Sequence, residues 1–131
     1  MSQILDQKSL LNFEPTILPQ AVIGDNTGVT VDTLGYDAAT AFCQLDDAAT
    51  GSFKLQDSDA SGSGFADVAD DLVITSDGSN DTAGVASEFV SIGYIGTKRY
   101  LRVFFTHTGS GDIAAGILLG SPQLAPTGAN S

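Results

Sequence analysis

The segment RYLRVFFTH at residues 99–107 alternates between two kinds of side chain. Its odd positions include the apolar Leu101, Val103 and Phe105, and its even positions mix polar and aromatic residues. Because successive side chains of a β-strand point to opposite faces of the sheet, this period of two predicts a strand with one buried face. In the segment IAAGILL at residues 113–119 the larger side chains Ile113, Ile117 and Leu119 share the odd positions, which also fits a strand. Together the two segments indicate an all-β protein.

The rest of the chain supports that fold class. Gly, Asp, Ser and Thr separate short apolar runs at intervals of roughly eight to twelve residues, which is typical of an antiparallel sandwich or barrel. We therefore expect an antiparallel β-sandwich of about eight strands. The predicted strands cover residues 21–23, 27–33, 40–45, 52–56, 71–75, 88–94, 99–108 and 113–119.

The two ends of the chain differ from its middle. Residues 1–20 contain two prolines, which predicts an extended N-terminal arm, although residues 2–12 also fit a short helix. We expect a sandwich domain over residues 21–121 and an irregular tail over 122–131. The arm either covers its own sandwich or docks on a partner subunit, because many large apolar side chains in a solvated tail are unfavourable. Its removal through residue 18 is expected to leave the sandwich folded.

Composition excludes several classes of function. The 131 residues include 16 acidic and 5 basic side chains, giving a formal net charge of -11. We expect no nucleic-acid partner and no adsorption to an anionic membrane, since both need clustered Lys and Arg. The lone Cys43 excludes an intramolecular disulfide. The sequence shows no secretory leader and no apolar stretch of membrane-spanning length, which predicts a soluble protein that stays in the compartment where it is made.

No motif predicts catalysis, and we expect neither an enzyme nor a metal or cofactor. His107 is the single histidine and ends a predicted strand, with no nucleophile motif to accompany it. Cys43 lies within an apolar strand and has no basic neighbour that would activate it. Residues 57–62 begin like a calcium loop, but Val68 occupies the position that needs a bidentate Glu. An ordinary Asp-rich turn explains that loop, and weak adventitious binding of a divalent ion is the alternative.

One segment stands out chemically. Residues 92–103, IGYIGTKRYLRV, hold three of the five basic residues of the chain. They are either ordinary surface side chains of a hairpin or a contact patch, since Arg and Tyr are enriched at the centres of interfaces. The candidate contact residues of this segment are Tyr94, Lys98, Arg99, Tyr100 and Arg102. Those of the arm are Leu10, Leu11, Phe13, Ile17 and Leu18.

A family resemblance adds to this interpretation. The chain carries, in order, FKLQDSD at 53–59, FADV at 65–68, IGYIGTKRYLRV at 92–103 and LGSP at 119–122. This series resembles the jelly-roll cement, or decoration, proteins of tailed bacteriophages. The resemblance spans residues 40–126, and GYIGTKRY at 93–100 is its most specific element. Phe65 departs from the pattern, which has Trp there.

The resemblance implies a jelly roll and a function. It implies a non-enzymatic virion protein, made in the host cytoplasm, that binds the outer surface of the capsid as a homodimer or homotrimer and clamps neighbouring major capsid proteins. Other virion roles of the same architecture are a fibre, a spike or a head–tail connector. A carbohydrate- or ligand-binding sandwich is a further alternative, although the chain has no Trp and only three Tyr for stacking on sugars.

Overall fold

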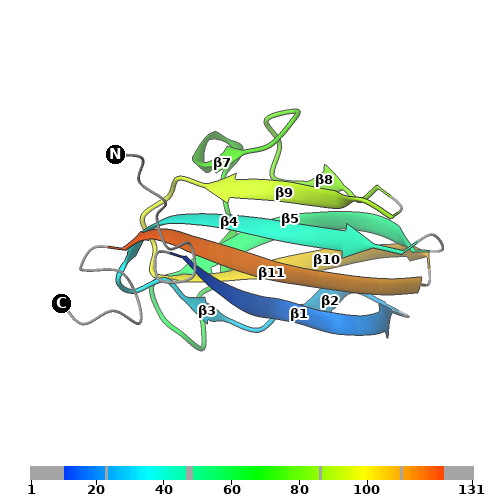
Figure 1. Cartoon of the computed structure of the whole chain (residues 1–131), viewed down its shortest axis with the longest axis horizontal. Coiled ribbons are helices and arrows are strands. Elements are labelled where there is room, and N and C mark those ends of the chain that lie inside the picture. The colour runs from blue at the N-terminus through cyan, green and yellow to red at the C-terminus, as the bar shows by residue number, and fades with distance from the viewer. Residues whose placement is uncertain (1–10, 23, 47–48, 86, 110, 123–131) are drawn as a thin grey trace, which may run out of the picture.

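The computed structural model describes residues 11–22, 24–46, 49–85, 87–109 and 111–122, which form two antiparallel sheets packed face to face (Figure 1). The five-stranded sheet has the order β1 (Asn12–Val22), β11 (Gly111–Pro122), β4 (Tyr36–Leu45), β9 (Phe89–Tyr94) and β7 (Val73–Ile74). The six-stranded sheet has the order β2 (Asn26–Thr27), β10 (Tyr100–Gly109), β5 (Thr50–Ser58) and β6 (Ala66–Asp67), with β3 (Val31–Asp32) beside β10 and β8 (Thr82–Ala83) beside β5.

The strand order is that of a jelly roll. Strands β2 and β3 both pair with β10, and β6 and β8 both pair with β5. When each of these pairs is taken as one interrupted strand, eight strands remain besides the short edge strand β7. The first, eighth, third and sixth then form one sheet, and the second, seventh, fourth and fifth form the other. This is the two-sheet arrangement of paired Greek keys. The prediction of an all-β antiparallel sandwich is confirmed.

The core lies between the two sheets and follows the predicted alternation. In β10, Leu101, Val103 and Phe105 are fully buried, and their neighbours in the strand are only half-buried. The rings of Phe53 and Phe105 pack with their centroids 4.9 Å apart. Burying each such side chain contributes about 1.5–3 kcal/mol, so these facing aromatic and aliphatic residues stabilise the contact between the sheets.

Strand β1 corrects the predicted boundary between arm and sandwich. The domain was expected to start at residue 21, but residues 12–22 already pair with β11 in the five-stranded sheet. Thr16 and Ile17 are buried there, at 1% and 2% exposure. Pro15 and Pro19 obscured this strand in the sequence, yet an edge strand tolerates proline because one side of its backbone needs no partner. The register of β1 shifts on either side of Ile17.

Two other predicted strands are wrong in detail. Where one strand was predicted over residues 27–33, the structure has two short strands, β2 and β3. Between them, Gly28 lies against Thr16 and the backbone of Val103. A Cβ atom at Gly28 would lie 2.4 Å from Thr16 Oγ1 and 2.6 Å from the Val103 carbonyl oxygen. Residues 71–75 begin within a 3₁₀ turn, Asp70–Leu72, and only Val73–Ile74 form a strand. Apart from Pro122, the predicted tail lies outside the described residues.

Candidate interaction surfaces

Tyr94, the first predicted contact residue, faces the interior. It ends β9 and is 9% exposed. Its hydroxyl group donates a 2.7 Å hydrogen bond to Oδ2 of Asp57 and accepts a 3.0 Å bond from the backbone N–H of Lys98. Burial and the neighbouring Asp57 carboxylate raise the pKa of Tyr94. Tyr94 therefore connects the two sheets, and it also lines a hollow at that end of the sandwich.

The basic side chains that follow Tyr94 form ion pairs within the molecule. Arg99 binds Asp32 through two hydrogen bonds of 2.8 and 2.7 Å, and the hydrogen bond from Arg99 lowers the pKa of Asp32. Lys98 Nζ lies 3.1 Å from Oδ2 of Asp59. All four side chains are substantially exposed, so these pairs add little to stability. A contact role for Lys98 and Arg99 stays a prediction.

Tyr100 and Arg102 lie on the outer face of the six-stranded sheet. The Arg102 guanidinium sits 4.1 Å from the centroid of the Phe65 ring, and its Nε donates a 2.8 Å hydrogen bond to Gln56. Phe65 thus supplies an aromatic surface for this cation without the Trp of the family pattern. Asp67 accepts hydrogen bonds from Lys54 and Gln56 on the same face. This outer face therefore carries charged and polar side chains that stack on aromatic rings, with Lys54 paired with Asp67.

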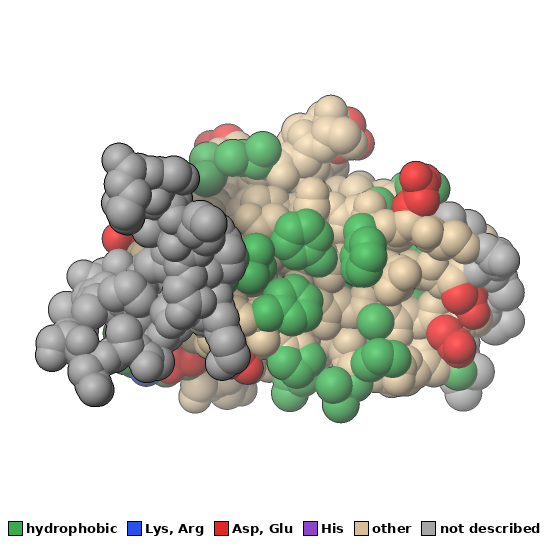
Figure 2. Space-filling view, in the orientation of Figure 1, with side chains coloured by type: hydrophobic (Ala, Val, Ile, Leu, Met, Phe, Trp, Pro, Cys, Tyr) green, Lys and Arg blue, Asp and Glu red, His purple; other side chains and the backbone are tan. Residues whose placement is uncertain are grey.

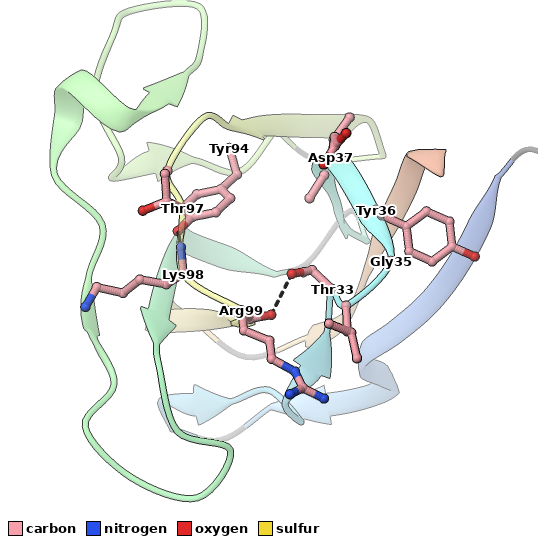
Figure 3. Close-up of a pocket in the computed structure, with 12 residues that line it drawn as sticks. Thr33, Gly35, Tyr36, Asp37, Tyr94, Thr97, Lys98 and Arg99 are labelled. Carbon is pink, nitrogen blue, oxygen red and sulfur yellow. Dashed lines mark hydrogen bonds between the residues drawn. The ribbon is translucent and has the colours of Figure 1, made fainter. Parts of the chain in front are cut away.

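A hollow of about 440 Å³ opens at the end of the sandwich beside the loop from Tyr94 to Arg99. Thr33 closes part of it by donating a 2.6 Å hydrogen bond to the Arg99 carbonyl oxygen (Figure 3). In the same view the Lys98 side chain extends away from the hollow. The Arg99 guanidinium is held by Asp32. The hollow therefore does not present these two cations to a bound anion.

The outer face of the five-stranded sheet has a different chemistry. In β4 and β11 the buried side chains alternate with outward ones, so Phe42 and Leu118 point away from the core. Phe13 pairs with Leu118 and covers Gly116, where a Cβ atom would lie 2.2 Å from the Phe13 ring. Phe89 is 67% exposed. We call this surface the apolar face; it consists of Phe13, Phe42, Ile74, Phe89, Ala114 and Leu118.

The apolar face is almost free of charge. Figure 2 shows hydrophobic side chains gathered over β1, β11, β4 and β9, with acidic groups toward the margin. Asp112 is the one charged residue among the described outward positions of β11, β4 and β9, and it lies near the start of β11. The uncharged polar residues Gln44 and Ser91 also lie on this face, opposite Phe89 and Phe42. A surface rich in exposed apolar side chains and rimmed by charged groups is characteristic of an interaction site.

The structure places the predicted contact residues of the arm in different environments. Phe13 belongs to the apolar face, Leu18 is 58% exposed, and Leu11 packs near Gly120. Ile17 is a core residue and is unavailable to a partner. Leu10 lies outside the described residues. The sequence analysis missed Phe42, Phe89 and Leu118, although apolar residues on both parities of 113–119 signalled a strand that is apolar on both faces.

Several chemical features are accounted for structurally. Cys43 is fully buried, and burial raises the pKa of its thiol. Asp57, the first residue of the calcium-like loop, faces Tyr94 inside the sandwich. Over the described ranges, no three His, Cys, Asp or Glu side chains come together as a possible metal site. In that same part of the chain no helix has the length and apolarity needed to cross a bilayer.

Comparisons with known proteins bear on the fold. No family model matches the chain, and no curated protein matches it. Among solved structures, it is similar to the SPBc2 prophage-derived protein YomS, with a TM-score of 0.55 and 12% sequence identity. The similarity covers 92% of this chain and 100% of the YomS chain. At this identity the likeness concerns the fold alone. By its own strand order and exposed side chains, the chain is a two-sheet jelly-roll protein with one apolar outer face.

Proposed function

We propose that this protein is a structural component of a bacteriophage particle, a cement protein that binds the outer surface of the assembled capsid. It acts as a homo-oligomer and links neighbouring major capsid proteins. The observation that carries the proposal is the pair of unlike outer faces, one apolar and almost free of charge, the other bearing Lys54, Arg102 and Asp67. A small jelly roll with two such faces is suited to joining proteins.

Two further observations support a phage origin and a position outside the shell. The similar fold of YomS belongs to a prophage-derived protein. The net charge of -11 disfavours contact with packaged DNA, because like charges repel. Synthesis in the host cytoplasm is compatible with the single Cys43 being a buried thiol.

Stabilisation of the shell would follow from binding linkage. A protein that binds only the expanded shell stabilises that state by RT ln(1 + [L]/Kd), which is about 4 kcal/mol per site at a thousandfold excess over Kd. An oligomer that contacts two neighbouring sites gains further affinity, because its second contact forms at high effective concentration. Weak individual contacts are therefore sufficient for firm attachment.

Co-sedimentation with phage particles tests this function. The purified protein is mixed with unexpanded shells, expanded shells, isolated tails and portal complexes of candidate phages, and the pelleted fraction is measured. We expect saturable binding to expanded shells and a higher temperature of shell disruption. Binding to tails or portals alone would instead indicate a fibre, spike or connector, and binding to none of these particles would contradict a virion role.

A further inference from the structure

We propose that the apolar face is the surface through which two copies of this chain pair, with one five-stranded sheet packed against the other. This inference rests on the proposed function, because it identifies the contact that makes the homo-oligomer. The occupant of the face is then a second copy, and the capsid is bound by other surfaces.

The first argument is the free energy available from burial. Phe13 and Phe89 are 57% and 67% exposed, and Ile74 is 62% exposed on the edge strand β7. The register places these side chains on the same face as the half-buried Phe42 and Leu118. Aromatic side chains that expose this much area gain about 25 cal/mol for each Å² removed from water. When two sheets pack face to face, the outward side chains of one sheet are buried against those of the other.

The second argument is charge. Each copy carries a formal net charge of -11, so most contacts between two copies bring acidic groups together. The outward residues in the middle of β11, β4 and β9 are uncharged, and Asp112 lies at one end of that surface. Two copies can therefore meet at the apolar face with the least repulsion. A basic partner would gain more from the acidic surface elsewhere on the molecule.

The third argument is size. Strands β1, β11 and β4 have ten to twelve residues, which at about 3.3 Å per residue gives a face about 35 Å long. With the six-residue β9 beside them, four strands at about 4.8 Å spacing make it about 15–20 Å wide. A symmetric pair would bury about 1,000 Å² in total, which reaches the size expected of a specific protein interface. In a two-fold pair each substitution on the face occurs twice, which doubles its effect.

Pairing through the apolar face leaves the other surfaces of each copy open for contact with the capsid shell. The outer face of the six-stranded sheet, with Lys54, Arg102 and Asp67, points outward on both sides of the pair. The loop that carries Lys98 and Arg99 lies at an end of each sandwich. The pair therefore offers two identical sets of polar contacts on opposite sides, which fits a clamp between neighbouring capsid proteins.

The test measures mass in solution by sedimentation equilibrium across a concentration series, with the full chain and without shells. Wild type is compared with Phe89→Lys and Ile74→Lys, two exposed positions of the apolar face. Val29→Lys is the matched control, because Val29 is 61% exposed in the segment between β2 and β3, beside the other sheet. Circular dichroism melting confirms that each variant is folded.

We expect a wild-type mass of twice 13.4 kDa, at least a tenfold rise in the dimer dissociation constant for both face variants, and no change for Val29→Lys. A monomeric wild type, or a dimer unaffected by both face variants, overturns this inference. Shell binding is measured separately on the same samples. If wild type dimerises through this face but binds no phage particle, the pairing surface stands and the proposed function fails.

Discussion

Tyr94 and Asp57 join the two sheets from inside the sandwich, with 2.7 Å between the Tyr94 hydroxyl oxygen and Oδ2 of Asp57. Tyr94 ends β9 of the five-stranded sheet, whereas Asp57 is the penultimate residue of β5 in the other sheet. Because the same hydroxyl also accepts the Lys98 N–H, it fixes the start of the loop that leads into β10. The segment GYIGTKRY at residues 93–100 thus contains a side chain, Tyr94, that links the two sheets.

Replacing Tyr94 with Phe should destabilise the fold. The change removes the donor to a carboxylate that is 7% exposed, and an unsatisfied buried group of this kind costs about 1–3 kcal/mol. Urea unfolding measures the free energy of unfolding directly. Tyr100→Phe is the control, since Tyr100 lies half-buried on an outer face, and we expect it to cost under about 0.5 kcal/mol. Equal losses in the free energy of unfolding for the two variants would contradict a stabilising role of the Tyr94–Asp57 hydrogen bond.

Asn80 should be similarly sensitive. It is 4% exposed, accepts a hydrogen bond from the Leu55 N–H and donates to the carbonyl oxygens of Leu55 and Val68. Asn80→Ala leaves these three backbone groups without that partner, so we expect a loss of at least about 2 kcal/mol in a denaturant titration. The exposed Asn26→Ala is the comparison and should be nearly neutral; a nearly neutral Asn80→Ala would contradict this bonding scheme.

Strand β1 should be required for folding, contrary to the expectation from the sequence. The Thr16 hydroxyl accepts a 3.2 Å hydrogen bond from the Val103 N–H and donates to the Val29 carbonyl oxygen, which ties β1 to the opposite sheet. Thr16→Val should cost about 1–3 kcal/mol, and deletion of residues 1–18 should abolish cooperative melting. Thr30→Val, at an exposed threonine, serves as control. If the chain without residues 1–18 still unfolds cooperatively, that segment is a separable arm and the requirement for β1 is contradicted.

The pKa of Asp67 should depend on two neighbours. Hydrogen bonds from Gln56 and then Lys54 lower it from its ordinary value. Because the folded-state pKa is the lower one, the stabilisation is present above about pH 4 and is lost as pH falls toward the folded pKa. Gln56→Leu and Lys54→Met should each raise the Asp67 pKa in an NMR titration, whereas Lys98→Met should not. An unchanged titration in both variants would rule out this polar network.

The sequence predicted strands best where every second side chain is an apolar core residue. β5, β9, β10 and β11 each have alternating positions that became core, as in Leu101, Val103 and Phe105. β1 was missed because its prolines suggest irregular structure, and only pairing with β11 shows that they occupy an edge. The interruption at Gly28 depends on how closely Thr16 approaches it, a contact between residues that are distant in sequence.

The candidate surfaces were less predictable for the same reason. Arg99 and Asp32 are 67 positions apart, so their pairing is not evident from either local sequence. Tyr94 was expected at the surface because it lies among basic residues, but strand parity places it with Ile92 in the core. The apolar face is assembled from five strands, and each contributes only one or two exposed or half-buried hydrophobic side chains.

The most direct measurement of the central claim is a cryo-electron microscopy map of expanded capsid shells incubated with this protein. The account predicts ordered jelly-roll density on the outer surface, with two copies joined through their five-stranded sheets and polar surfaces against neighbouring capsid proteins. Bare shells at saturating protein would contradict the capsid-binding function. Bound copies whose apolar faces rest on the shell would contradict the pairing inference and retain the function.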